Sequence, residues 1–263
     1  MVGESLDDFK LKNLIVGILN LYYEENEIEI PVPLNISIVE DMTIAYEEVT
    51  KTKIVNDNLN RFNGFTIPPS TIHGVFNILL NKNALMESVQ NNNANWIGTI
   101  IHEATHANDF CQFAKMIQAD NYDDITNLGK NAMFQLWTEF HARLKGYYYV
   151  RKYSFENMFD EKQIPDIIDR ELPYQDKYMY NTYHSTANGY EQAYCVSHYI
   201  GRLCALNIIF PETFNDSFVK DKFGTNDWMY KWYKFLSQHL KLEEAVLDFE
   251  EMREILSENF IGI

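Results

Sequence analysis

The residues best suited to chemistry lie in one short stretch of this sequence. It contains His102-Glu103-x-x-His106, a spacing that is typical of zinc sites on helices. Residues four apart lie on the same face of a helix, so His102 and His106 could hold one ion together. Glu103 would then lie beside the ion, where it could take a proton from a bound water molecule. The pattern therefore predicts a metal site with a general base.

The faces of the predicted helix, residues 96–117, support this interpretation. At about 100° per residue, its apolar side chains fall on one face, and His102, His106 and Asp109 fall on roughly the opposite face. The apolar face consists of Trp96, Ile97, Ile100, Ala104, Ala107 and Cys111. We therefore expect this helix to form one wall of a polar cleft. The alternative is two solvated histidines on an ordinary surface helix.

A catalytic zinc site needs a third protein ligand, and Glu139 is the best candidate. It lies on a second predicted helix, residues 131–151, opposite the apolar stripe of that helix. The stripe consists of Met133, Trp137, Phe140, Leu144 and Tyr148, and the neighbours of Glu139 are Ala132, Ala142 and Gly146. Such small neighbours would let the two helices approach closely. The alternative is a surface Glu139 paired with Arg143 one turn later.

Two other residues compete for the role of third ligand. His141 lies closer to the apolar stripe of the same helix, which favours a packed core histidine. Asp227 belongs to Gly224-Thr-Asn-Asp-Trp-Met-Tyr230, which matches most of the GTxDxxYG string of aspzincins. Lys231 replaces the last glycine of that string, and Asp227 lies much farther along the chain than Glu139. Metzincins carry a third histidine six residues after the second, where this chain has Gln112.

An HExxH helix followed by a helix with a glutamate resembles the gluzincin arrangement of the zincin metallopeptidases. The order of elements also resembles the ImmA/IrrE-like peptidases. The resemblance covers roughly residues 34–150, and only HExxH is specific. It implies a minimal zincin fold, zinc ligands His102, His106 and Glu139, and Glu103 as general base. It also implies that the strand at residues 74–81 is an edge strand along which an extended peptide would pair.

The chain departs from this family at one supporting position. Thermolysin-like gluzincins carry an aspartate four residues after the ligand glutamate, and it supports a zinc histidine. This chain has Arg143 there. Asp109, on the histidine face of the first helix, is the candidate for that support. A plain surface carboxylate is the alternative for Asp109.

The expected function is hydrolysis of peptide bonds by a zinc-activated water, with Glu103 as general base. A second donor to the oxyanion is normally required. The candidates lie downstream, and packing is the default role of each: Tyr183, His184, Tyr190, Tyr194 and His198. The alternatives are a zincin-like module that binds a partner protein without cleaving it, and a metal-dependent hydrolase of a non-peptide bond.

The hydrophobic pattern predicts a helix-rich α+β fold with a small sheet before the HExxH helix and a mostly helical C-terminal half. Strands are expected at residues 34–39 and 74–81, and residues 51–69 are polar and turn-rich. Further helices are expected at residues 6–25, 41–50, 190–208, 227–240 and 242–260. Because no linker separates the halves, we expect residues 1–263 to form one compact unit. Residues 1–151 would be the catalytic core, and residues 152–263 would form the other side of the cleft.

Composition limits the possible partners. The net charge of −16 argues against nucleic acid or an anionic membrane, so a peptide or protein substrate is the expected partner. Three cysteines without CxxC spacing favour a reducing compartment. The acidic N-terminus is unlike a signal peptide, and the apolar run at residues 14–19 is too short to span a bilayer. We therefore expect a soluble, cytoplasmic protein, with export by a route without a signal peptide still open.

Overall fold

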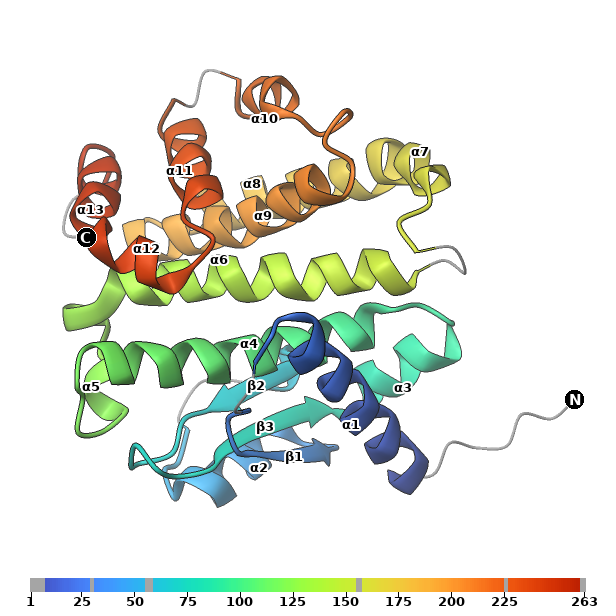
Figure 1. The fold of residues 1–263 in the computed structure, drawn as a ribbon, viewed down its shortest axis with the longest axis vertical. Helices are drawn as coiled ribbons and strands as arrows, with labels where there is room; N and C mark the ends of the chain where they lie inside the picture. The colour runs from blue at the N-terminus through green and yellow to red at the C-terminus, as the bar shows by residue number, and fades with distance from the viewer. Residues whose placement is uncertain (1–7, 29–30, 55–58, 155–157, 225–226, 261–263) are drawn as a thin grey trace, which may run out of the picture.

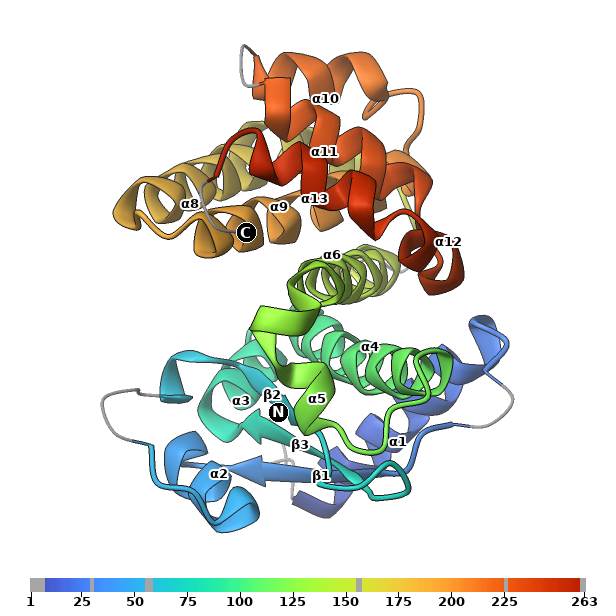
Figure 2. The same cartoon turned by 90° about the vertical axis from the view of Figure 1, so that its left-hand side faces the viewer.

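A small sheet lies at one end of a stack of helices (Figure 1). The structure is a computed structural model that describes residues 8–28, 31–54, 59–154, 158–224 and 227–260. Helix α4 (Asn95–Met116) packs between the sheet and helix α6 (Leu128–Tyr153), and helix α9 (Gly189–Ile209) packs against the other side of α6. Figure 2 shows the same layers from the side. Helix α6 is therefore the central element of the fold.

The sheet has the strand order β1-β3-β2. Strand β3 (Phe76–Asn81) is central, with β1 (Leu34–Val39) parallel on one side and β2 (Gly64–Ile67) antiparallel on the other. Ile78 and Leu80 pack with helices α1 (Asp8–Glu25) and α4, whereas Leu79 packs with α2 (Met42–Thr50) on the opposite face. Because successive side chains of a strand point to opposite faces, β3 is buried on both sides.

Short polar side chains mark the starts of several helices. The Asp41 carboxylate accepts hydrogen bonds from the backbone N–H groups of the first turn of α2, and Asn188 does the same for α9. Asn127 caps α6, whose backbone has a non-helical residue at Asn131. The predicted start of this helix, residue 131, therefore coincides with a kink. Such caps satisfy N–H groups that have no partner within the helix.

The two central helices touch through glycines. A Cβ atom added to Gly146 of α6 would lie 2.6 Å from the carbonyl oxygen of Gly98 and 3.2 Å from the Cβ of His102. A Cβ added to Gly98 of α4 would lie 2.9 Å from the Gly146 oxygen. Any larger residue at either position would therefore push the helices apart. The predicted close approach of the two helices is confirmed at Gly146.

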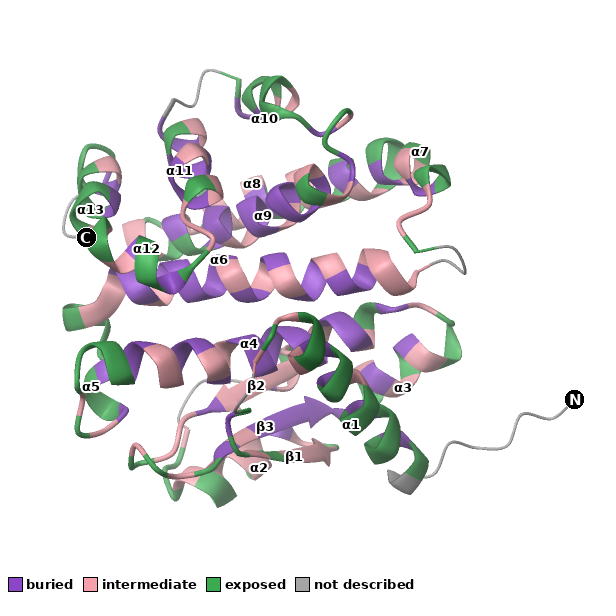
Figure 3. Cartoon of the chain, in the orientation of Figure 1, coloured by how far each residue is buried: buried purple, intermediate pink, exposed green. Residues whose placement is uncertain are grey.

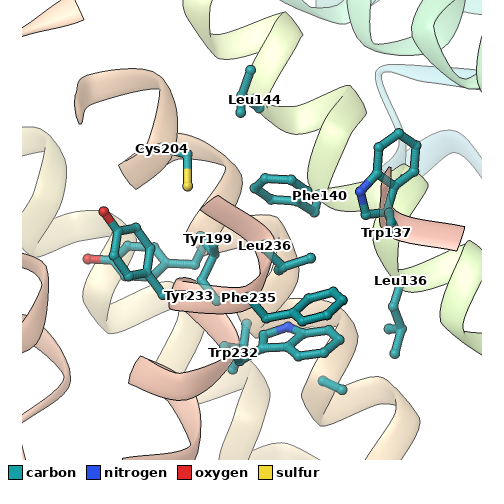
Figure 4. Close-up of a cluster of buried hydrophobic side chains, with 14 of the residues drawn as sticks. Leu136, Trp137, Phe140, Leu144, Tyr199, Cys204, Trp232, Tyr233, Phe235 and Leu236 are labelled. Atoms are coloured by element: carbon teal, nitrogen blue, oxygen red, sulfur yellow. The ribbon is translucent and has the colours of Figure 1, made fainter. Parts of the chain in front are cut away.

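The C-terminal half covers the side of α6 that faces away from α4. Aromatic side chains fill the space between α6, α9 and α11, among them Phe140 of α6, Tyr199 of α9 and Trp232 of α11 (Figure 4). The indole N–H groups are satisfied as well, because Trp232 donates to Ser197 Oγ at 2.8 Å and Trp137 to the carbonyl oxygen of His239 at 2.8 Å. Most residues of α6 and α9 are buried or partly buried, and most exposed residues lie on the outer elements (Figure 3).

The remaining helices are short or lie toward the outside. They are α3 (Lys82–Gln90), α5 (Asp123–Thr126), α7 (Ile164–Asp166), α8 (Leu172–Ser185), α10 (Asp216–Phe223), α11 (Asp227–Gln238), α12 (Leu242–Leu247) and α13 (Phe249–Ser257). Short 3-10 turns lie at Leu59–Arg61 and Glu161–Gln163, and a π-helical turn at Ile167–Glu171 joins α7 to α8. Every described helix is too short or too polar to cross a bilayer.

The predicted fold class, a helix-rich α+β chain, is confirmed. The expectation that residues 74–81 form an edge strand is wrong, because β3 lies between β1 and β2. The edge strand beside α4 is β2, from the stretch interpreted as polar and turn-rich. Its four residues are too few to show an alternating pattern, whereas the apolar run Ile78-Leu79-Leu80 is typical of a strand buried on both faces.

Other differences concern short elements. Helix α3, at residues 82–90, was not predicted, and residues 242–260 form two helices, α12 and α13, instead of one. The first helix begins at Asp8, and residues 6–7 of its predicted range lie outside the described part. Helix α10 was not predicted at all. Helices of fewer than ten residues show too few turns for a reliable period.

The Gly146 contact can be tested by Gly146→Ala. The added methyl group has no room against the Gly98 carbonyl, so we expect unfolding by urea to show a loss of about 1–3 kcal/mol. The matched control is Gly17→Ala in the exposed part of α1, where nothing lies within 4 Å of the new atom. The control should be stabilised by up to about 1 kcal/mol. Equal stabilisation of both variants would contradict the close contact.

Candidate metal centre

Three side chains from two helices converge beside the α4–α6 crossing. His102 and His106 come from α4, and Glu139 comes from α6. Their ligand atoms all lie within 4.8 Å of one another, and the group could hold a metal ion. His102 and Glu139 are buried, with 8% and 5% of their surfaces exposed, and His106 is partly buried.

The spacing of these atoms suits tetrahedral coordination. The two Nε2 atoms lie 3.1 Å apart. Glu139 Oε1 lies 3.7 Å from His102 Nε2, and Glu139 Oε2 lies 3.4 Å from His106 Nε2. Ligands at zinc–ligand distances near 2.05 Å would be roughly 3.3 Å apart in a tetrahedron. The donor set of two imidazoles and one carboxylate therefore fits an ion of this size and leaves a fourth position for water or substrate.

His106 is oriented by a chain of hydrogen bonds behind it. The Thr138 hydroxyl donates to Asp109 Oδ2 at 2.8 Å, so it accepts from His106 Nδ1, which lies 3.1 Å away. This arrangement puts the proton on Nδ1 and leaves Nε2 free to bind a metal. Asp109 was the candidate for supporting a zinc histidine, and in the structure it reaches His106 through Thr138. His102 Nδ1, which faces the main chain of Ala142, forms no hydrogen bond of good geometry among the described residues.

Glu103 lies between the two histidines and faces strand β2. The Thr66 hydroxyl lies 2.7 Å from Glu103 Oε2 and 2.9 Å from the Glu103 carbonyl oxygen. Only 6% of Glu103 is exposed. Burial raises the pKa of this carboxyl, and the positive charge of His106 and the Thr66 hydrogen bond act in the opposite direction. A raised pKa makes the carboxylate a stronger base.

Helix α9 adds polar side chains to the same group. Tyr194 donates a hydrogen bond to Glu139 Oε2 at 2.8 Å, and His198 Nε2 lies 3.7 Å from Glu139 Oε1. Tyr190, one turn before Tyr194, lines the same cavity. Tyr183 stacks on Trp228, and His184 contacts Tyr180 and Tyr183. Of the five oxyanion candidates, the structure therefore brings Tyr190, Tyr194 and His198 to the site and leaves Tyr183 and His184 outside it.

The protonation states of the group are set by burial and by Glu139. Burial would raise the pKa of Glu139, but its interactions with the surrounding histidines hold it well below its usual range. Burial holds the pKa values of His102 and His198 well below their usual value. Burial and the Glu139 carboxylate raise the pKa of Tyr194 well above its usual value. At neutral pH, Glu139 is therefore an anion, His102 is neutral and Tyr194 carries its proton.

The group lies in a cleft of about 1500 Å³. Residues 64–70, which include β2, form one side, α4 and α6 contribute the metal group, and α8 and α9 form the other side. Residues of both halves of the chain thus line one cavity. The outer edge of β2 pairs with no other described strand, so its backbone groups border the cleft.

Comparison of the chain with protein-family models, curated proteins and solved structures finds no match. The interpretation of this site therefore depends on its own residues.

Three competing assignments from the sequence can be compared with the geometry. Glu139 is buried and faces the histidines, so the alternative of a surface glutamate paired with Arg143 is wrong. His141 is turned away from the group; its Nδ1 lies 3.0 Å from Asp109, and its ring stacks on Trp137. The side chain of Asp227 lies outside the described part of the chain, and α11, which begins there, packs on α9, α10 and α13.

Sequence reasoning missed three polar residues at this site. Thr66 and Thr138 carry no motif, because a single threonine has no spacing that marks it as functional. Arg202 follows His198 by one turn on α9 and lines the same cavity. The four-residue spacing of Tyr190, Tyr194, His198 and Arg202 is a polar stripe on an otherwise apolar helix, and it could have been found from the sequence.

Removing the carboxylate of Glu139 should reduce metal binding. For Glu139→Ala, dialysed against buffered zinc, we expect metal analysis by mass spectrometry to show strongly reduced occupancy, since two histidines alone hold zinc poorly. Asp227→Ala should bind as the wild type does. Full occupancy in Glu139→Ala together with loss of metal in Asp227→Ala would reverse the assignment.

The Thr138 hydroxyl should matter for affinity without touching the metal. Thr138→Val keeps the shape but breaks the link from Asp109 to His106, so zinc affinity should fall about 10–100-fold. Competition with a chromophoric chelator measures this change. Thr71→Val, at an exposed loop position, is the control. Unchanged affinity in Thr138→Val would show that the hydrogen-bond chain does not orient His106.

Proposed function

We propose that this protein is a zinc-dependent metallopeptidase. The observation that carries the proposal is the buried His102–His106–Glu139 group with Glu103 beside it, in a cleft bordered by the free edge of β2. Zinc bound there would supply a water molecule with a pKa of about 7 and polarise the scissile carbonyl. A glutamate between the two histidines in the sequence favours a zinc hydrolase over other kinds of metal site with two histidine ligands and one carboxylate ligand.

In this proposal Glu103 moves the proton. Its carboxylate accepts a proton from the attacking water and passes it to the leaving nitrogen. The hydrogen bond from Thr66 holds Oε2 in place. The raised pKa of Glu103 suits this exchange, because a base whose pKa lies nearer the working pH both accepts and returns a proton readily.

Tyr194 and His198 are the proposed donors to the oxyanion. Both lie within reach of Glu139, on the side of the metal group that α4 leaves open. The raised pKa of Tyr194 keeps its hydroxyl protonated and able to donate. Donors held in place before the reaction stabilise the developing charge without reorganisation.

Strand β2 is the proposed guide for the substrate. Its edge next to the cleft carries backbone N–H and C=O groups, and an extended peptide would add to it as a further strand. Residues 64–67 of β2 line the cleft over their whole length. This role passes from residues 74–81 to β2, because β3 is already paired on both sides.

Glu103→Gln tests the mechanism. Cleavage of a peptide library should fall by at least about 10²–10⁴-fold, because the neutral amide cannot accept the proton. Zinc content should stay at the wild-type level, since Glu103 is not among the proposed ligands. Glu87→Gln, on the exposed face of α3, should keep full activity.

Three outcomes would change the proposal. Full activity in Glu103→Gln would overturn the role of the base. Wild-type protein that binds zinc but cleaves no peptide would favour a module that binds a partner without cleaving it. Zinc-dependent cleavage of esters or other bonds in the absence of peptide cleavage would favour a hydrolase of another class.

A further inference from the structure

Two arginines line the cleft next to the candidate metal group. Arg143 follows Glu139 by one turn on α6, and Arg202 follows His198 by one turn on α9. Residues one turn apart share a helix face, so Arg143 borders the same space as Glu139, and Arg202 borders the same space as His198. Both side chains are half-buried in the wall of the cavity.

A glycine brings the two helices together at this point. A Cβ atom added to Gly201 would lie 2.6 Å from the carbonyl oxygen of Phe140 and 2.9 Å from the Cβ of Arg143. The backbone of α9 therefore touches the base of the Arg143 side chain, and Arg202 is the next residue. The positive charge of Arg143 acts on Arg202 across this contact: burial, and after it the Arg143 charge, lower the pKa of Arg202 to about 10.

Neither arginine has a carboxylate partner among the described residues. Arg143 Nε is buried without a hydrogen bond, and Arg202 donates to the neutral side-chain oxygen of Gln175. By contrast, Arg151 at the end of α6 pairs with Glu171 at 3.2 Å. Partly buried arginines without an anionic partner are costly, and such groups are more common at binding sites than elsewhere.

A bound metal would leave these charges still less balanced. Two carboxylates act on Arg143, those of Glu139 and Glu103, and their negative charges oppose the lowering of its pKa by burial. Glu139 faces His102 and His106, so its charge would be shared with the ion. With an ion bound, this part of the cleft would therefore carry a net positive charge, although the whole chain carries a net charge of −16. The overall charge therefore does not describe the site.

We propose that Arg143 and Arg202 form a carboxylate-binding subsite next to the metal group. Guanidinium groups bind carboxylates through paired hydrogen bonds, which a neutral side chain cannot replace. The ligand is a peptide carboxylate close to the scissile bond, either of an acidic side chain or of the C-terminus. As a statement about substrates this rests on the proposed peptidase function, whereas carboxylate binding itself does not.

The test uses three small probes with the metal-free, full-length protein. The α-amide of N-acetylglutamate carries only a side-chain carboxylate, free N-acetylglutamine carries only a terminal carboxylate, and the α-amide of N-acetylglutamine carries none. Titrations by ligand-observed NMR should show at least one charged probe binding about tenfold more tightly than the uncharged one. The charged probe that binds identifies the source of the carboxylate. Added salt should weaken the binding of a charged probe and leave the binding of the uncharged probe unchanged.

Variants test whether the two arginines cause the tighter binding of the charged probe. Arg143→Gln and Arg202→Gln should each reduce the binding advantage of the charged probe to less than about threefold. Arg143→Lys should keep part of this advantage, because lysine keeps the positive charge but cannot form the paired hydrogen bonds of a guanidinium group. Arg170→Gln, at an exposed position outside the cavity, should change nothing. Thermal unfolding identifies any variant that does not fold. If one of the two glutamine variants does not fold, the other one, compared with the wild type, still tests the subsite.

Three results would overturn the subsite. They are equal binding of all three probes by the wild type, an advantage that survives in both folded glutamine variants, and an advantage that appears only after zinc is added. The last result would assign the carboxylate to the metal. Loss of peptidase activity in Glu103→Gln without loss of probe binding would separate this inference from the proposed function, because the binding measurement needs neither zinc nor turnover.

Discussion

The contact between α4 and α6 at Gly98 and Gly146 is the constraint on which the candidate centre depends. Glu139 and the two histidines belong to different helices, and their ligand atoms can meet only if the helix axes lie unusually close. The same approach lets Thr138 reach from α6 to both His106 and Asp109 on α4. The remaining layers serve this pair, since the sheet supports α4 from below and α9 supports α6 from above (Figure 1).

Charge is distributed unevenly in this protein. The surface carries the excess of acidic groups, whereas the cleft is lined, in the part of the chain that the structure describes, by three histidines, three arginines and four carboxylates. In the low dielectric of a closed cleft, each of these charges acts more strongly than it would at the surface. Glu139 is the anion that the histidines share, whereas Arg143 and Arg202 form no ion pair with a carboxylate among the described residues. A metal ion and an anionic ligand would therefore complete each other's charge balance.

Most of the long elements could be predicted from the sequence, although α8, of 14 residues, was missed. Among the short elements, α2, β1 and β3 were predicted, whereas β2, α3 and α10 were not. The periods of α4, α6 and α9 extend over several turns, so their apolar faces and their positions were predictable. Strand β2 has four residues and α3 has nine, and their patterns are too short to separate from a polar loop. The position of a strand within its sheet is also not a local property. For this reason β3 was recognised as a strand but placed at the edge.

The sequence by itself determined that His102, Glu103 and His106 share one turn of a helix, because a four-residue spacing is a local property of the backbone. It also identified Glu139 as a ligand candidate, because its small neighbours indicated a close helix contact. Only the tertiary structure decided which distant residues join them: Thr66 on β2, and Tyr194, His198 and Arg202 on α9. These choices depend on how helices and sheet pack, and packing is decided by the whole core and not by any single segment.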